Sequence, residues 1–149
     1  MWCDFVVFLN RYRATKVTIK GEPTGPLAGK TFAIKDNIFV AGVPLQNGSK
    51  IWDGYTPEFD ATVVTRILKA GGTITGKSTC ENMCFSGGSF TSASGAVLNP
   101  HDKTRQTGGS SSGSAALVRT AFHFRCCSRQ SLQFLWLIQQ LSPHQLNQH

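Results

Sequence analysis

Residue types that could carry nucleophilic or proton-transfer chemistry gather in one stretch of this chain, residues 107–118. Three serines, Ser110, Ser111 and Ser112, follow Gly108 and Gly109 and lead directly into small, helix-forming residues. Glycine lets the backbone approach a ligand closely, while serine supplies hydroxyls and caps the unpaired amides of a helix start. A Gly/Ser tract is also typical of a flexible linker, but the abrupt change to small apolar residues favours a loop that enters a helix.

A candidate base, Lys35, follows the short apolar run of residues 31–34 and precedes Asp36 and Asn37. An apolar run bounded by turn residues predicts a buried strand that ends at a turn. From composition alone, Lys35 is interpreted as a solvated charge at the strand end. To accept a proton from a serine, its amine must be uncharged, which burial among the flanking apolar residues would favour.

Other elements must position these residues. Residues 61–70 are expected to form a helix that Asp60 caps and Gly71 ends, with its apolar side chains on one face. Strands are predicted near residues 16–19 and at residues 73–75, and a short helix around residues 80–85. The order strand, helix, strand over residues 31–77 predicts an α/β fold with a parallel sheet.

An ordered set of short motifs resembles the amidase signature family, whose members hydrolyse carboxylic amides. The likeness runs from about residue 25 to residue 118 and is greater to the small-molecule and nitrile-pathway amidases than to the amidotransferase subunit that acts on charged tRNA. It implies an N-terminal fragment of the family's α/β fold, with a mixed, largely parallel sheet and flanking helices. The motifs that carry it are residues 25–30, 34–38, 41–44, 47–49, 59–64, 76–81, 86–89 and 107–118.

The resemblance implies a catalytic triad of a lysine, a serine in a cis peptide bond and a second, nucleophilic serine. Lys35 corresponds to the lysine and Ser110 to the cis serine, with Gly108, Gly109 and Ser111 supporting the loop. A helix-capping role is expected for Ser111 and Ser112. The implied reaction converts a small-molecule amide to an acid plus ammonia or an amine, without a cofactor.

The third triad member has no counterpart in this chain. In the family, the nucleophile lies roughly two dozen residues beyond the cis serine, inside a Gly-Gly-Ser turn whose amides stabilise the oxyanion. Here that position is Phe134, and the nearby Ser128 and Ser131 have no glycine neighbours. The chain is therefore expected to be a partial amidase that is inactive by itself.

Composition changes at the same point. None of the 15 glycines and 8 acidic residues falls after Val118. We therefore interpret residues 119–149 as a divergent tail, from a shifted reading frame or an alternative exon, after a partial amidase domain at residues 25–118 and an ill-defined segment at residues 1–24. The apolar part of the tail, residues 131–141, leaves open a non-enzymatic fragment that binds a partner.

A rival interpretation is a nucleotide-binding phosphate loop, because Gly71–Ser78 matches its spacing. β-branched residues fill the supposed loop, which counts against it. The formal charge is +7, but basic residues are not interleaved with aromatics, so nucleic-acid binding is not expected. Five cysteines without framework spacing indicate free thiols, a cytoplasmic location and no metal site. No apolar run approaches the roughly twenty residues of a membrane span.

Overall fold

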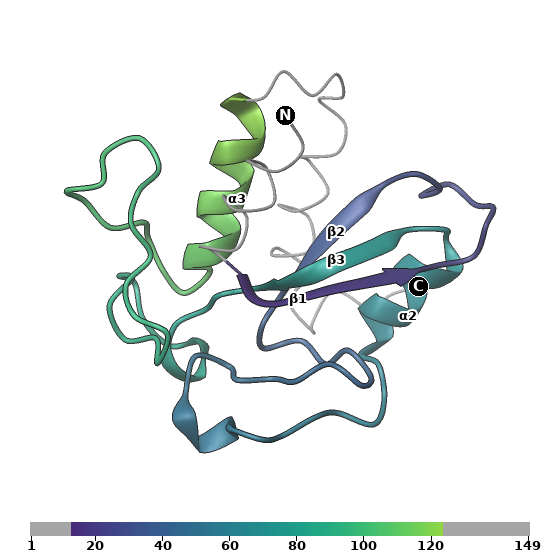
Figure 1. Ribbon diagram of the computed structural model, residues 1–149, viewed down its shortest axis with the longest axis horizontal. Coiled ribbons are helices and arrows are strands. Elements are labelled where there is room, and N and C mark those ends of the chain that lie inside the picture. The colour runs from purple at the N-terminus through teal and green to yellow at the C-terminus, as the bar shows by residue number, and fades with distance from the viewer. Residues whose placement is uncertain (1–12, 124–149) are drawn as a thin grey trace, which may run out of the picture.

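The computed structural model describes residues 13–123 of the chain, and these form a three-stranded sheet with helices against it (Figure 1). The strand order is β1-β3-β2, with β1 antiparallel and β2 parallel to the central strand β3. In chain order the elements are β1 (Arg13–Lys20), β2 (Thr31–Lys35), the 3-10 helix η1 (Lys50–Trp52), α2 (Thr62–Lys69), β3 (Thr73–Ser78), the 3-10 helix η2 (Asn82–Cys84) and α3 (Ser112–His123). The α/β class with a mixed sheet is thus confirmed.

The predicted strand, helix, strand unit is present as β2, α2 and β3. Helix α2 buries Val64 and Ile67 on one face, as the spacing of apolar residues predicted. The predicted cap was wrong, because Ala61 occupies the N-cap position and no side chain caps the helix. Asp60 instead accepts a hydrogen bond from the Ala41 backbone amide at 2.7 Å and so joins two loops.

The main core lies between α2 and one face of the sheet. Phe32 and Ile34 of β2 and Ile74 of β3 are almost completely buried there against Val64 and Ile67. Burying side chains of this size contributes about 1.5–3 kcal/mol each relative to exposure. This packing fixes β2 and β3 side by side and therefore fixes where their C-terminal ends lie.

Helix α3 covers the other face of the sheet. Ala116 and Leu117 pack with Val97, and Ala33 of β2 packs against this second cluster. Ala33 points away from the main core because successive strand residues face opposite sides of a sheet. The Ser114 and Ser78 hydroxyls, 2.7 Å apart and buried, tie α3 to the end of β3. The glycine-rich loop thus enters a helix, as predicted, directly beside the strand ends.

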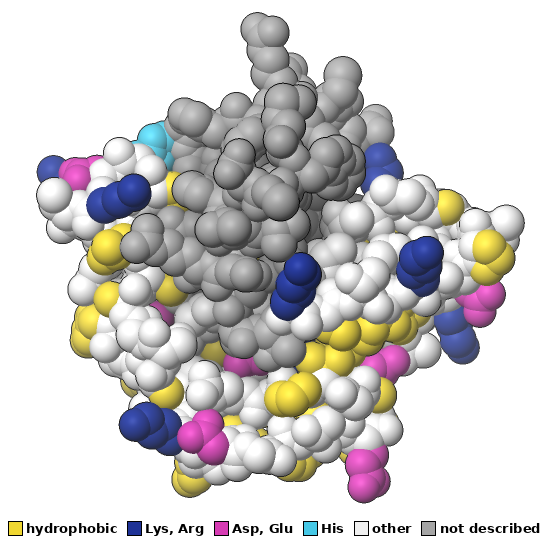
Figure 2. All heavy atoms as spheres, in the orientation of Figure 1, with side chains coloured by type: hydrophobic (Ala, Val, Ile, Leu, Met, Phe, Trp, Pro, Cys, Tyr) yellow, Lys and Arg dark blue, Asp and Glu magenta, His cyan; other side chains and the backbone are white. Residues whose placement is uncertain are grey.

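Two surface properties bear on function. Within residues 13–123, no helix has the length and apolar character needed to cross a membrane. On the face of the molecule seen in Figure 2, the Lys and Arg side chains of the described residues stand apart from one another. The described residues of this face therefore form no continuous basic patch.

Candidate active site

Lys35 and Ser110 meet at the C-terminal end of β2. The Lys35 Nζ donates a hydrogen bond to Ser110 Oγ at 2.9 Å, although the residues are 75 positions apart. Lys35 ends its strand, and Ser110 lies two residues before α3 begins. The Gly109–Ser110 peptide bond is cis. The structure therefore brings together the lysine and the serine that the sequence singled out.

Backbone contacts hold the serine loop against its neighbours. Ser110 O accepts a hydrogen bond from Glu81 N at 3.1 Å, and Gly109 N donates one to Gly87 O at 2.9 Å. A Cβ at position 109 would lie 2.3 Å from Gly88 O, whereas a Cβ at position 108 would meet nothing within 4 Å. Of these two glycines, Gly109 is therefore the one required by close approach, because its neighbours are backbone atoms that cannot easily yield.

Glu81, whose role the sequence analysis missed, links the loop that contains Ser110 and Ser112 to the segment that contains Phe90 and Thr91. Its Oε1 accepts a hydrogen bond from Ser112 Oγ at 2.9 Å, and its Oε2 accepts from the backbone amides of Phe90 and Thr91 at 3.0 and 2.8 Å. Burial alone would raise the pKa of this carboxyl, but the hydrogen bonds from Thr91 and Ser112 outweigh it and hold the pKa below its ordinary value. Glu81 is fully buried, and no local sequence pattern indicates its several partners.

The two predicted caps of α3 differ in the structure. Ser111 stands directly before the helix, and its carbonyl accepts a hydrogen bond from Ala115 N at 3.0 Å. Ser112 does not act as a cap, because its hydroxyl donates to Glu81. The capping prediction for Ser112 was therefore wrong, because a carboxylate is a strong acceptor and this one comes from a distant part of the sequence.

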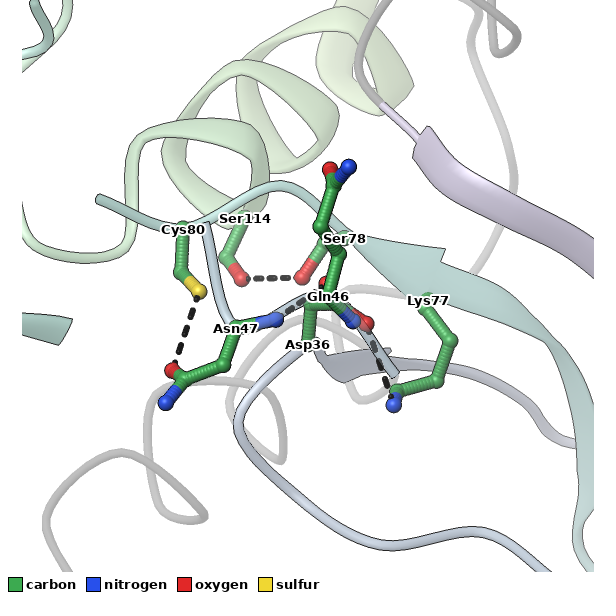
Figure 3. Close-up of polar contacts among 7 residues, drawn as sticks. All are labelled: Asp36, Gln46, Asn47, Lys77, Ser78, Cys80 and Ser114. Atoms are coloured by element: carbon green, nitrogen blue, oxygen red, sulfur yellow. Dashed lines mark hydrogen bonds and ion pairs between the residues drawn. The ribbon is translucent and has the colours of Figure 1, made fainter. Parts of the chain in front are cut away.

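A second lysine, Lys77, belongs to the polar network that Figure 3 shows around Asp36. Its Nζ is 3.1 Å from Asp36 Oδ1, and both side chains are essentially inaccessible to solvent. Asp36 Oδ2 also accepts hydrogen bonds from the backbone amides of Gln46 and Asn47. Burial raises the pKa of Asp36 and lowers that of Lys77, and each partner partly offsets the shift of the other.

This network leaves the phosphate-loop alternative without support. Gly76, Lys77 and Ser78 form the end of strand β3 and do not begin a helix. A phosphate-binding lysine must reach solvent, whereas Lys77 is buried and paired with a carboxylate. Lys77 is therefore a residue of the strand end.

Two thiols adjoin the Lys35 side of the site. Cys80 is buried and its Sγ lies 3.8 Å from Asn47 Oδ1 (Figure 3), while Cys84 is half-buried. A hydrogen bond from Cys80, together with the nearby Lys35 amine, lowers the pKa of Cys84 to about 6. The same thiol contact and burial raise the pKa of Cys80. In the described part of the chain, no three His, Cys, Asp or Glu side chains are grouped to hold a metal ion.

The position expected for the nucleophile and the apolar tail both lie outside the described residues. This applies to Phe134, Ser128, Ser131 and the segment 131–141. The described residues therefore provide the lysine, the cis serine and their supports, namely Gly109 and Glu81.

Comparisons with known proteins place this arrangement among known folds. The family model named Amidase matches residues 6–123, a wider range than the motifs alone indicated. An enantioselective amidase of Rhodococcus rhodochrous is 56% identical over 104 residues, which cover 68% of this chain and 20% of that protein. A glutamyl-tRNA(Gln) amidotransferase subunit of Halobacterium salinarum is 49% identical, covering 70% of this chain and 25% of that protein.

Solved structures agree with these sequence matches. The corresponding glutamyl-tRNA(Gln) amidotransferase subunit of Thermotoga maritima matches with a TM-score of 0.64 and 35% identity, over 72% of this chain and 24% of that one. A 6-aminohexanoate cyclic dimer hydrolase shares the fold, with a TM-score of 0.68 at 24% identity, over 78% of this chain and 26% of that one. The chain spans between a fifth and a quarter of the length of the curated relatives described above.

Proposed function

This chain belongs to the amidase family, and we propose that it carries the base and the relay serine of an enzyme that hydrolyses small-molecule carboxylic amides. Lys35 is the proposed base and Ser110 the proposed relay. The observation that supports these roles is the 2.9 Å contact between Lys35 Nζ and Ser110 Oγ across 75 residues of sequence. A contact of this length satisfies the geometric requirement for direct proton transfer.

In the proposed reaction, the uncharged amine of Lys35 accepts the proton of Ser110 Oγ. Ser110 in turn takes the proton of a nucleophilic serine, which attacks the amide carbonyl carbon and forms a tetrahedral intermediate. The proton returns to the leaving nitrogen, the carbon–nitrogen bond breaks, and ammonia or an amine departs. Water, deprotonated by the same relay, then cleaves the acyl ester and releases the acid. No cofactor enters these steps.

We propose that the nucleophilic serine is not supplied by this chain. The sequence after Ser110 contains no Gly-Gly-Ser turn, and no glycine follows Val118. Without a nucleophile and its oxyanion-stabilising amides, the relay has nothing to activate. We therefore expect the 149-residue chain to show no amide hydrolysis by itself.

A chimera that obtains the nucleophile from a related enzyme tests the proposed roles of Lys35 and Ser110, even if this chain is inactive by itself. Residues 1–118 of this chain would replace the matching segment of the Rhodococcus rhodochrous enantioselective amidase, which supplies the remainder. We expect the chimera to hydrolyse amides, and Lys35→Met or Ser110→Ala to reduce kcat by about 10³-fold. Lys69→Met, at an exposed helix position, is the matched control and should leave kcat unchanged.

The result that would reject the proposal is a folded Lys35→Met or Ser110→Ala chimera with the kcat of the unmodified chimera. Circular dichroism and thermal unfolding of each variant would establish that it is folded. Hydrolysis of an amide by the isolated chain would reject only the proposal that the nucleophile is missing.

A further inference from the structure

Glu81 contacts the loop of Ser110 at several points, although it contributes no atom to the contact between Ser110 and Lys35. Its backbone N donates to Ser110 O at 3.1 Å, and its Oε1 accepts from Ser112 Oγ at 2.9 Å. A Cβ built on Gly109 would lie 3.0 Å from Glu81 Cγ, so the aliphatic part of the side chain passes next to Gly109. One residue therefore touches the loop before, at and after Ser110.

The segment that carries Glu81 runs alongside the loop and adds two further backbone contacts. Gly109 N donates a hydrogen bond to Gly87 O at 2.9 Å, and Gly113 N donates one to Thr79 O at 3.0 Å. Together with the contacts of Glu81, they join the loop to this segment on both sides of the proposed relay serine.

The other oxygen of the Glu81 carboxylate is held by a different part of the chain. Oε2 accepts hydrogen bonds from Phe90 N at 3.0 Å, from Thr91 N at 2.8 Å and from Thr91 Oγ1 at 2.8 Å. Because both oxygens belong to one planar group, the donors on Oε2 also fix the direction of Oε1. The Ser112 hydroxyl therefore meets an acceptor whose position is set by residues 90–91.

A buried carboxylate is an energetically costly side chain for this position. Glu81 is fully buried, and neither of the two ion pairs within residues 13–123 involves it. A buried charge without a cationic partner costs free energy that hydrogen bonds must offset, and well-packed apolar side chains often stabilise a fold as well or better. This favours a role for Glu81 in fixing the geometry of its partners over a role in general stability.

We propose that Glu81 is a positioning residue, which acts through Ser112 and through its own backbone N to hold Ser110 Oγ within reach of Lys35 Nζ. The inference rests on the proposed function of Lys35 and Ser110. Proton transfer requires a contact of about 2.6–3.2 Å, and a misplacement of about 1 Å lowers a rate by about 10²-fold. The 2.9 Å contact between Lys35 and Ser110 therefore depends on the loop conformation that Glu81 maintains.

Two substitutions remove comparable hydroxyl donors from the same carboxylate. Ser112→Ala removes the donor on the loop of Ser110, at 2.9 Å from Oε1, and Thr91→Val removes a donor on the opposite side, at 2.8 Å from Oε2. Thr91→Val leaves two backbone amides on Oε2, so the carboxylate stays in place. Both variants should lose similar stability in thermal unfolding, whereas only Ser112→Ala releases the loop from the carboxylate.

The first measurement is amide hydrogen exchange in the full 149-residue chain, which requires no activity. The amides of Glu81 and Gly109 report the backbone contacts of the loop, and the amide of Ile74 in the central strand corrects for global stability. Ser112→Ala should raise the corrected exchange rates of both loop amides about tenfold, because a hydrogen bond to a charged group is lost. Thr91→Val should change them by less than about twofold.

The second measurement is the activity of the amidase chimera. Ser112→Ala should lower kcat about tenfold at an unchanged KM, because it displaces the relay and not the bound substrate. Thr91→Val should lower kcat by no more than about twofold. Ser112→Cys keeps the size of the side chain but supplies only a weak donor, so its kcat should lie between those of the unmodified chimera and Ser112→Ala.

The positioning role would be overturned by corrected exchange rates at Glu81 and Gly109 that neither Ser112→Ala nor Ser112→Cys changes. Equal losses of kcat for Ser112→Ala and Thr91→Val would also overturn it, because the contact would then matter only for stability. A chimera that keeps its kcat after Lys35→Met would reject the proposed function itself. Loss of kcat in Lys35→Met but not in a folded Ser112→Ala chimera would reject the positioning role alone.

Discussion

Lys35 and Lys77 stand on neighbouring parallel strands, one register step apart, and have opposite environments. Lys35 is paired with Ser78 across the strands, and Lys77 with Ile34. Because strand residues alternate between faces, Lys77 points to the side of the α2 core and Lys35 to the side of α3. Lys77 meets a buried carboxylate, whereas Lys35 meets a serine hydroxyl.

The difference shows that the partner, and not the residue type or the position in the strand, separates a structural lysine from a candidate base. Lys77 is paired with a carboxylate at 3.1 Å and is inaccessible to solvent, so its amine is closed off from a substrate. Neither ion pair of the described residues involves Lys35. Lys35 instead donates a hydrogen bond to the neutral Ser110 hydroxyl, which is the contact that the proposed base role requires.

The largest expected effect comes from breaking the structural pair. Asp36→Ala leaves the Lys77 ammonium buried without its carboxylate and frees the amides of Gln46 and Asn47. We expect the free energy of unfolding to fall by about 3–5 kcal/mol, measured by urea denaturation.

The matched change on the other face is Lys35→Met, which removes one hydrogen bond to a neutral hydroxyl. It should change the free energy of unfolding by no more than about 1 kcal/mol. Equal losses for Asp36→Ala and Lys35→Met would contradict the assignment of one lysine to structure and the other to chemistry.

A smaller loss of unfolding free energy is expected for a substitution at Glu81, which holds the loop of Ser110 that contacts Lys35. Glu81→Gln replaces the Oε1 or Oε2 acceptor by an NH₂ group, so at least one donor among Phe90, Thr91 and Ser112 loses its partner. The unfolding free energy should fall by about 2 kcal/mol at neutral pH. The thermal midpoint of the two proteins measures this difference.

The difference in unfolding free energy between the wild type and Glu81→Gln should also depend on pH. The folded-state pKa of Glu81 is below its ordinary value of 4.5, so the carboxylate contributes stability that is fully present above pH 4.5 and is lost as pH falls through the lower folded-state pKa. The gap between wild type and Glu81→Gln should therefore narrow on acidification below pH 4.5. A gap that stays constant would show that Glu81 is not held as a carboxylate.

The last pair of substitutions compares two adjacent glycines. Gly109→Ala would place a methyl group 2.3 Å from Gly88 O and should destabilise the protein by about 1–3 kcal/mol. Gly108→Ala meets nothing within 4 Å and is the control. In the amidase chimera, Gly109→Ala should lower kcat because it moves Ser110, while Gly108→Ala should not. Equal effects of the two substitutions would mean that the loop is not closely packed at Gly109.

Much of the local structure could be predicted from the sequence. The apolar run at residues 31–34 and the helical spacing of Val64 and Ile67 reflect periodicities that depend only on neighbouring residues. The change from glycine and serine to small apolar residues likewise indicated the start of α3. The pairing of Lys35 with Ser110 came from family resemblance, because no local pattern relates residues 75 positions apart.

What the sequence by itself determined was which segments form strands, helices and loops, and which family the motifs resemble. Only the tertiary structure decided that Asp60 joins two loops, that Ser112 donates a hydrogen bond to Glu81, and that Lys77 pairs with Asp36. Short polar side chains and amines can each satisfy their hydrogen bonds in several ways. The partner is chosen by which groups the packing of α2 and α3 on opposite faces of the sheet brings within about 3 Å.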